Sequence, residues 1–589
     1  MKFTIDDNGD SQSVNLGLVA GCLLNQHADD DSNKAFSYYS NNNELARDYN
    51  FFFENYEFCS KVIFKILNSK EDIDVSYDYC RILTSPWALT FTMIALERYQ
   101  SIIKLIGNNC IELENKIENA NFVLEKAGDL FRESQSDKYN NLIIFQILSA
   151  IQKFRGSNHS STIKCLLEEN DFVFEPSMIK PKRRDLNYRF TQKVVDFIKY
   201  KLTNFAEYAM SLKAQKSSRA LFLLPEFSIF DIIRIFVNQK SAFQILHSVK
   251  IPAVNNLNNN REFSEYSRVF ENNELSFVLQ ELILKNLPRE FLECFNQYKN
   301  SAHKLIGNEV SRVITRSPTD TNPIVRHIMA QTYDLKILSI SMQHGGGYNN
   351  YENHPLDLLE RTLVDKYLVW GGISIKPSMV VGITRTSWFS LYPKKYYNNN
   401  GNLLVVAPPL RRYYAGDFSY PISFVFAYQQ NMQIFFRFLK KTLYKKTVYR
   451  MGWDFGAGEA EWIKGISPQI NISTRENVSH AYKDVLRSRI VVCTYNSTLW
   501  LELSKINHPF VLVLDGRFDL ITSLNEKVFS IMEENNMLFF NPETAAKHVS
   551  NCFENPSKWW EEEKIQLTRI KINDAFCQSL NPYEFAKNI

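Results

Sequence analysis

The sequence lacks the features of a secreted, membrane-spanning or strongly basic protein. Nine cysteines occur in 589 residues without a CxxC pair, a pattern typical of free thiols in a reducing compartment. The formal net charge is only +4, which is too small to favour nucleic acid as a partner. Acidic Asp6 and Asp7 stand where a signal peptide would have its apolar core. The longest apolar stretches are about half a membrane span, so we expect a cytoplasmic protein.

Three common nucleotide-binding motifs are also missing. The sequence has no Walker loop and no GxGxxG, which disfavours a P-loop enzyme and a dinucleotide oxidoreductase. No DxD pair stands at the end of a predicted strand as a metal–diphosphate ligand. We therefore expect metal-independent chemistry that uses no cofactor.

The most informative segment is 341–349, in which three consecutive glycines follow Gln343 and His344. It comes after the apolar residues 335–340, which predict a buried strand. Glycine has no Cβ, so backbone N–H groups can approach an anion closely and φ can become positive. A histidine there can bind a phosphate or move a proton near neutral pH. A tight turn beside a core histidine is the alternative, but a strand that opens into glycines favours a ligand site.

Periodicity divides the chain into three parts. Residues 1–210 are mainly helical, with apolar residues at three- and four-residue spacing. Residues 211–395 and 403–589 alternate strands with helices, as parallel sheets with helices on their faces do. The Asn-rich run 396–402 is the clearest linker. The predicted fold class is α/β, with two Rossmann-like domains facing a cleft and a mainly helical N-terminal elaboration.

The individual strands and helices can also be predicted. In the first α/β part we expect strands at 220–224, 249–251, 366–370 and 379–383. In the second part we expect strands at 403–407, 447–451, 490–493 and 510–514, and helices at 424–443, 481–485 and 499–506.

A second candidate site follows the predicted strand 490–493. Asn496, Ser497 or Thr498 would cap the next helix and leave N–H groups and two hydroxyls at the positive end of its dipole. Such a helix start is an anion site by geometry. Glu502, one turn into the helix, could bind a sugar hydroxyl. An ordinary N-cap with a surface acid is the alternative.

Two arginines in the same half follow strand ends. Arg411 comes after the predicted strand 403–407 and Arg450 lies within the strand end at 447–451, where a guanidinium can clamp a phosphate. Ligands of open α/β sheets bind outside the carboxyl ends of the strands. Surface arginines are common, so neither residue alone is specific. Together with the Ser497 turn they predict a cleft for a nucleotide phosphate.

Several short motifs resemble a known family. The Gln343-His344-Gly-Gly turn, segment 365–371 and the helix start at Ser497 resemble a family of transferases encoded in bacterial O-antigen and surface-polysaccharide loci. Residues 79–87 and 97–99 also resemble the N-terminal signature of that family. The C-terminal half is similar to teichoic-acid glycerophosphotransferases and bacterial β-Kdo transferases, which have the GT-B fold and use cytidine-nucleotide donors. Asn349 departs from the glycine expected after Tyr348, and 451–453 replace an Arg-x-His-Pro-like element.

The resemblance implies roles for the candidate residues. It places His344, with Gln343, Gly345 and Gly346, at the interdomain cleft near the transferred group. It implies that Ser497, Thr498 and Glu502 hold the phosphate and ribose of the donor.

The catalytic carboxylate is not identified by the sequence. Asp320, Glu309 and Glu352 all lie near the histidine turn in sequence, and any of them could be a base or a nucleophile. Retention and inversion therefore both stay open.

The predicted function is transfer of a nonulosonic acid, Kdo-like or sialic-acid-like, from a CMP-sugar to a surface glycan or protein acceptor. A CMP donor carries one phosphate and needs no metal bridge, because helix N-termini and arginine can stabilise its charge. A CDP-alditol phosphotransferase of teichoic-acid type and a non-catalytic scaffold in polysaccharide assembly are the alternatives. The basic and aromatic run 435–446, on a predicted helix, suits peripheral contact at the inner face of the membrane. A solvated basic face on a core helix is the other interpretation of that run.

Overall fold

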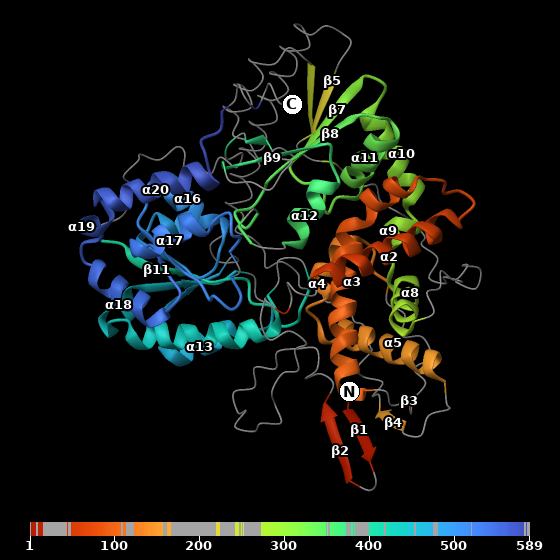
Figure 1. Cartoon of the computed structure of the whole chain (residues 1–589), viewed down its shortest axis with the longest axis horizontal. Coiled ribbons are helices and arrows are strands. Elements are labelled where there is room, and N and C mark those ends of the chain that lie inside the picture. The colour runs from red at the N-terminus through yellow and green to blue at the C-terminus, as the bar shows by residue number, and fades with distance from the viewer. Residues whose placement is uncertain are drawn as a thin grey trace, which may run out of the picture.

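The computed structural model describes most of the chain in separate stretches. These are residues 2–7, 10–15, 49–107, 110–113, 123–156, 162–166, 219–223, 242–246, 273–348, 350–351, 354–372, 379–380, 400–416, 420–452, 455–474, 481–519 and 521–581, and positions 44, 249, 251, 382 and 585. They form two parallel sheets with helices and a mainly helical N-terminal region (Figure 1).

The first sheet has six parallel strands in the order β10-β9-β8-β7-β5-β6. Its strands are β5 (Arg219–Leu223), β6 (Ala242–Leu246), β7 (Val310–Thr315), β8 (Leu338–Met342), β9 (Lys366–Val369) and β10 (Met379–Val380). When the six strands are numbered in chain order and the sheet is read from its β6 edge, the strand order is 2-1-3-4-5-6, as in flavodoxin-like doubly wound sheets. Helices α11 (Pro323–Asp334) and α12 (Pro355–Thr362) connect β7 to β8 and β8 to β9.

The second sheet also has six parallel strands, in the order β13-β12-β11-β14-β15-β16. Its strands are β11 (Asn402–Val406), β12 (Thr447–Arg450), β13 (Asn471–Ser473), β14 (Ser488–Cys493), β15 (Phe510–Val513) and β16 (Leu538–Phe539). Its helices are α13 (Ile422–Phe438), α14 (Glu459–Ile466), α15 (Ala481–Val485), α16 (Thr498–Ile506), α17 (Glu526–Glu534), α18 (Pro542–Cys552), α19 (Pro556–Trp560) and α20 (Glu563–Phe576). The order 3-2-1-4-5-6 is that of a Rossmann sheet, and it reverses between β11 and β14.

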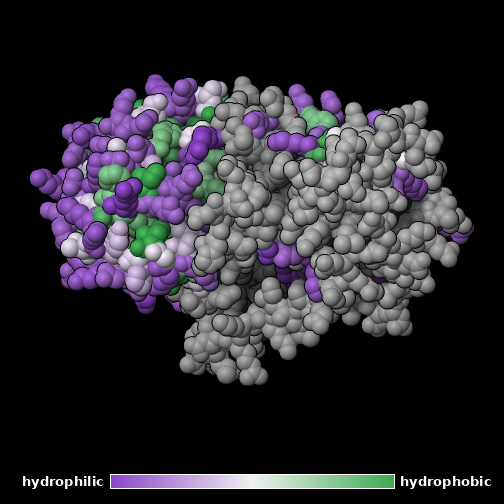
Figure 2. Space-filling view, turned by 90° about the horizontal axis from the view of Figure 1, so that it is seen from below, coloured by the Kyte–Doolittle hydropathy of each residue, from purple (hydrophilic) through white to green (hydrophobic). Residues whose placement is uncertain are grey.

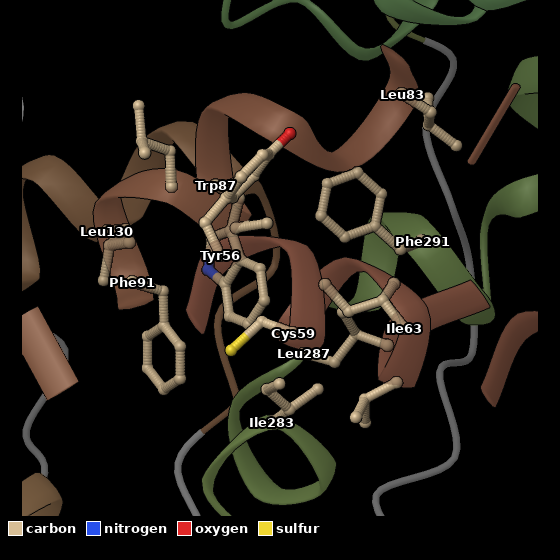
Figure 3. Close-up of a cluster of buried hydrophobic side chains, with 14 of the residues drawn as sticks. Tyr56, Cys59, Ile63, Leu83, Trp87, Phe91, Leu130, Ile283, Leu287 and Phe291 are labelled. Atoms are coloured by element: carbon tan, nitrogen blue, oxygen red, sulfur yellow. The ribbon is translucent and has the colours of Figure 1, made fainter. Parts of the chain in front are cut away.

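The N-terminal region consists mainly of helices packed on the first α/β unit. They are α2 (Tyr49–Asn68), α3 (Tyr77–Ile106), α4 (Leu130–Glu133) and α5 (Asp137–Arg155), followed later in the chain by α8 (Glu274–Asn286), α9 (Arg289–Leu292) and α10 (Phe295–Ile306). Figure 3 shows the core that they share, in which Trp87 and Phe91 of α3 stack at 4.6 Å between ring centroids. Phe291 of α9 meets the Trp87 ring edge-on in the same cluster. The predicted domain limits at 210, 395 and 403 stay predictions. Helix α8 lies beyond residue 210 in the chain yet packs with α2 and α5.

A small four-stranded sheet joins the N-terminal region. It has the order β2-β1-β4-β3 and consists of β1 (Lys2–Asp7), β2 (Asp10–Asn15), β3 (Cys110–Leu113) and β4 (Thr162–Leu166). The sequence analysis predicted none of these strands: each is only four to six residues long, and all four lie in the part that was expected to be mainly helical. The predicted fold class, two Rossmann-like α/β domains with a mainly helical N-terminal region, is confirmed.

Besides the strand expected at 379–383, of which β10 covers only Met379–Val380 while Gly382 lies outside it, three predicted elements were wrong in position or extent. The second strand of the first sheet is β6, and the described positions Val249 and Ile251 lie outside any strand. The strand expected at 335–340 begins only at Leu338, because Leu335 caps α11 and Lys336 has φ 55°. The helix expected through 435–446 breaks at Leu439, whose backbone is extended, and a 3₁₀ segment follows over Lys441–Lys446.

The C-terminal helix α20 leads the chain back to the first sheet. The residues after β9 pair with the end of α20: Gly372 donates its N–H to the carbonyl oxygen of Asp574 at 2.9 Å, and Gln578 donates to that of Trp370 at 2.9 Å. A Cβ on Gly371 would lie 2.0 Å from the carbonyl oxygen of Ala575, so only glycine fits there. This contact couples the two α/β units at a second place besides the site described below.

None of the helices within the described ranges combines the length and the apolar character needed to cross a bilayer. Viewed from below (Figure 2), the described residues are mostly hydrophilic, with small hydrophobic patches between them. Peripheral membrane contact through 435–446 stays a prediction, and Phe435 and Phe436 of that run are fully buried.

Candidate functional site

Gln343 shapes the turn at the carboxyl end of β8. Its backbone N–H donates to the carbonyl oxygen of Leu368 at 2.8 Å, and its side-chain oxygen accepts the N–H of Trp370 at 3.1 Å. Its side-chain nitrogen donates to the carbonyl oxygen of Gly345 at 2.9 Å. The buried amide therefore ties the ends of β8 and β9 together and fixes the backbone on which His344 stands.

His344 is partly open to solvent, with a side chain 27% exposed. Its Nε2 lies 3.1 Å from the hydroxyl oxygen of Tyr348, whose ring meets the imidazole edge-on. Its Nδ1 lies 3.6 Å from Oε2 of Glu360. The histidine therefore stands between a phenol and a carboxylate with part of its ring accessible.

Glu360 of α12 is a residue that the sequence analysis missed. It is fully buried, and Oε1 accepts hydrogen bonds from the hydroxyls of Ser317 at 2.8 Å and Thr319 at 2.6 Å. Oε2 accepts one from Tyr367 at 3.3 Å. A lone glutamate on a short amphipathic helix carries no sequence signal, because its importance comes from hydroxyls contributed by other segments.

His354 begins α12 and packs behind the site. Its Nδ1 accepts the backbone N–H of Asp357 at 3.1 Å, and its ring stacks on Tyr348 with centroids 5.3 Å apart. Burial lowers the pKa of His354 to about 4, so this ring is neutral at physiological pH. It packs against Tyr348, the ring that also contacts His344.

The glycine turn contacts the start of α16 directly. The N–H of Gly346 donates to the side-chain oxygen of Thr498 at 2.9 Å, and a Cβ on Gly346 would lie 2.7 Å from Cα of Thr498. None of Gly345, Gly346 and Gly347 has a positive φ, so the freedom of glycine to adopt left-handed backbone is not used in this turn. Glycine is needed at Gly346 because two backbones approach each other, one from each α/β unit.

Ser497 and Asn496 lie at the N-terminal end of α16. Ser497 is the N-cap, with extended backbone and no hydrogen bond from its side chain to the first turn. Asn496 is fixed by accepting the indole N–H of Trp500 at 2.9 Å on its Oδ1. The hydroxyl of Thr494 donates to the carbonyl oxygen of Val406 at 2.8 Å, which joins the ends of β14 and β11. The α16 start therefore flanks the point where the strand order reverses, the usual ligand position of a doubly wound sheet.

Glu502 lies farther along α16. It is half-buried, and its charge adds to the burial that raises the pKa of the Cys493 thiol. This places the carboxylate near the end of β14. The predicted contact of Glu502 with a sugar hydroxyl stays a prediction.

The two predicted arginines both have protein partners. Arg450 is buried and donates to Oδ2 of Asp484 at 2.6 Å and to Ser473 at 3.2 Å. The guanidinium of Arg411 lies 4.2 Å from the ring centroid of Phe131 in α4. Arg411 therefore joins the second α/β unit to the N-terminal helices, and a phosphate contact for either arginine stays a prediction.

The three candidate carboxylates are placed differently. Asp320 is buried, pairs with Arg316 at 3.1 Å and accepts the N–H of Asn322 at 2.8 Å just before α11. Glu309 is exposed at the amino end of β7, on the sheet edge opposite to His344. Glu352 lies outside the described residues, as does Asn349. Catalytic roles for Asp320 and Glu352 stay predictions.

A buried cluster that the sequence did not reveal lies next to the glycine turn. Tyr351 and Tyr420 donate hydrogen bonds to Oδ1 of Asp519 at 2.7 and 2.9 Å. Tyr351 also forms an antiparallel bridge with Ile521. Burial raises the pKa of Asp519 to about 6. The cluster fixes the segment after the glycines against the second α/β unit.

Comparisons with known proteins give a family and several distant structures. Residues 22–584 match the family described as LIC12162 family transferase. No curated protein matches the chain. Among the described residues, no group of three or more His, Cys, Asp or Glu side chains is arranged to hold a metal ion.

The solved structures similar to this chain share little sequence with it. TarM is 10% identical with a TM-score of 0.34, over 49% of this chain and 56% of that one. The UDP-GlcNAc 2-epimerase of Neisseria meningitidis is 10% identical with a TM-score of 0.34, over 60% and 98%. The wall teichoic acid polymerase TagF is 12% identical with a TM-score of 0.30, over 69% and 96%. At this distance no activity carries over from them.

Proposed function

The chain belongs to the LIC12162 family of transferases, and from that premise we propose that it is a glycosyltransferase. The proposed donor is a CMP-activated nonulosonic acid, Kdo-like or sialic-acid-like, and the proposed acceptor is a hydroxyl of a surface glycan or protein. The reaction uses no metal, because a single phosphate can be held by helix N–H groups and polar side chains.

The contact between Gly346 and Thr498 is the observation that carries this proposal. It brings a partly exposed histidine from one sheet beside a helix N-terminus from the other. A helix N-terminus favours a phosphate, and a histidine can accept or donate a proton. These are the two functions that transfer from a nucleotide donor requires at adjacent positions. The donor phosphate is assigned to Ser497 and the first turn of α16.

The proposed step needs no reactant beyond donor and acceptor. The acceptor oxygen forms a bond to the anomeric carbon, and the bond from that carbon to the phosphate oxygen breaks. CMP leaves with the electron pair on its phosphate. Nε2 of His344 takes the proton of the acceptor hydroxyl. The acceptor hydroxyl would occupy the place of the Tyr348 hydroxyl, which now lies 3.1 Å from Nε2.

The test is incubation of the full-length chain with CMP-Kdo and with CMP-sialic acid, followed by measurement of released CMP. We expect one donor to be consumed, and we expect His344→Ala and Ser497→Ala each to lose most of the turnover. His303→Ala is the matched control, because His303 is exposed in the last turn of α10. If both site variants keep full turnover, the site is wrong. Consumption of CDP-glycerol with CMP-sugars left intact would favour a phosphotransferase instead.

A further inference from the structure

We propose that Glu360 is a positioning residue that holds His344 with its proton on Nδ1, so that Nε2 is the atom facing the reacting group. The inference deepens the proposed function and rests on it for its catalytic consequence, although the positioning itself can be measured without turnover.

The carboxylate of Glu360 is fixed before any substrate arrives. It is fully buried on α12, and the hydroxyls of Ser317, Thr319 and Tyr367 all donate to it. Ser317 and Thr319 come from the segment between β7 and α11, and Tyr367 comes from β9. Two separate segments therefore aim three donors at one buried carboxylate, an arrangement that immobilises it.

The remaining partner of this carboxylate is the imidazole. Nδ1 of His344 is buried, makes no hydrogen bond within the described structure, and faces Oε2 of Glu360 at 3.6 Å. This distance is longer than a hydrogen bond, but catalytic hydrogen bonds are often long before substrate binds and shorten in the complex. A small rotation of the ring would satisfy an Nδ1–H donor that otherwise stays unpaired in a buried place.

The other side of the ring has a different environment. Nε2 faces the hydroxyl of Tyr348, and the ring of Tyr348 stacks on His354. Tyr348 can donate to an unprotonated Nε2, which suits the same tautomer that Glu360 selects. Besides Glu360, the titratable groups that face His344 directly or through Tyr348 are therefore a phenol and a neutral imidazole, so Glu360 supplies the nearest negative charge.

The consequence is a histidine prepared to accept a proton. With Nδ1–H directed at a fixed carboxylate, Nε2 keeps its lone pair, which faces the hydroxyl of Tyr348 until an acceptor hydroxyl takes that place. When Nε2 takes the acceptor proton, Glu360 lies beside the positive charge that forms on the ring. The same division of roles, one carboxylate orienting and one nitrogen reacting, operates in catalytic triads.

The test uses the full-length chain labelled with ¹⁵N-histidine, in which the His344→Ala spectrum identifies the His344 signals among ten histidines. We expect the wild type to show a protonated Nδ1 and an unprotonated Nε2. Glu360→Gln should change this signature toward the opposite tautomer or a mixture. It should also lower kcat by roughly 100-fold or more, while KM for the CMP-sugar stays within about twofold.

Controls separate positioning from folding. Asp357→Asn removes another buried carboxylate of α12, one that pairs with Arg361 at 2.9 Å, and should leave the His344 signature unchanged. If Glu360→Gln does not fold, the double variant Ser317→Ala/Thr319→Ala keeps the carboxylate but frees it, and should change the signature in the same direction. A wild-type signature in the folded Glu360 variants overturns the assignment, whatever the activity. A changed signature in a chain that consumes no CMP-sugar supports the positioning role and overturns the proposed function instead.

Discussion

Gly346 and Thr498 follow strands of two different parallel sheets, β8 and β14, yet the backbone N–H of Gly346 donates to the side-chain oxygen of Thr498 at 2.9 Å. The contact joins the turn after β8 to the first turn of α16. The carboxyl ends of both sheets therefore meet where the doubly wound fold places its ligands. The hydrogen bond engages the N–H of Gly346 and the hydroxyl of Thr498, two groups that the sequence suggested as phosphate ligands. Ser497 is therefore the polar side chain at the helix end to be tested for that role.

Replacing Gly346 with alanine should disturb the contact between the two α/β units. The new Cβ would lie 2.7 Å from Cα of Thr498 and 2.9 Å from the carbonyl oxygen of Ser497, and neither backbone can move freely. We expect Gly346→Ala to lower the free energy of unfolding by about 1–3 kcal/mol and to reduce turnover. Thermal unfolding of the variant measures the first effect.

The matched control is Gly347→Ala in the same turn. A Cβ there would meet the ring of Tyr351 at 3.6 Å, an ordinary van der Waals distance. We expect a clearly smaller change in melting temperature than for Gly346→Ala. Equal losses at the two positions would mean that the turn, and not the close approach to α16, requires glycine.

Substitutions of Thr498 test the hydrogen bond without changing backbone contact. Thr498→Val keeps the shape but removes the acceptor, so the partly buried N–H of Gly346 loses its partner at a cost of about 1 kcal/mol. Thr498→Ser keeps the hydroxyl and should stay close to the wild type. Urea unfolding of the three proteins checks this, and a Ser variant as unstable as the Val variant would argue against the hydrogen bond.

The sequence predicted the strands and turns that depend on neighbouring residues, and it missed the site residues whose partners come from distant segments. The strands 403–407 and 490–493 were predicted nearly in place, because central parallel strands are continuous apolar runs. The glycine turn was also recognisable, because three consecutive glycines after Gln343 and His344 are unusual by themselves. Glu360 and Asp519 were not, because each depends on hydroxyls contributed from elsewhere in the fold.

Asp519 should make stability depend on pH in an unusual direction. Burial raises its pKa from 3.8 to about 6, so the folded state binds a proton that the unfolded state releases. The stabilisation from this proton is complete below about pH 4 and is lost as pH rises through about 6. Because the proton stays with the folded state, the wild type gains stability from Asp519 on acidification.

The asparagine variant isolates this effect. Asp519→Asn resembles the protonated carboxyl at every pH, so its stability relative to the wild type should rise between about pH 4.5 and pH 7.5 by roughly 3 kcal/mol at most. The first unfolding transition in urea measures it at both pH values. Glu534→Gln, at an exposed position at the end of α17, changes net charge equally and should show no such rise. A constant difference between Asp519→Asn and the wild type would contradict the assigned protonation.

The ion pair of Arg450 and Asp484 gives the last prediction. Both side chains are buried, their charged atoms lie 2.6 Å apart, and the hydroxyl of Ser473 donates to Asp484 at 2.7 Å. Arg450→Met leaves the Asp484 carboxylate buried without its cation, so we expect a loss of roughly 3–5 kcal/mol in the free energy of unfolding. The double variant Arg450→Met/Asp484→Leu removes both charges and should recover most of that stability. A double variant as unstable as Arg450→Met would contradict the ion pair as the cause. If stability recovers but KM for the donor rises, Arg450 also contacts the phosphate, because the loss of binding then remains after the loss of folding has been repaired.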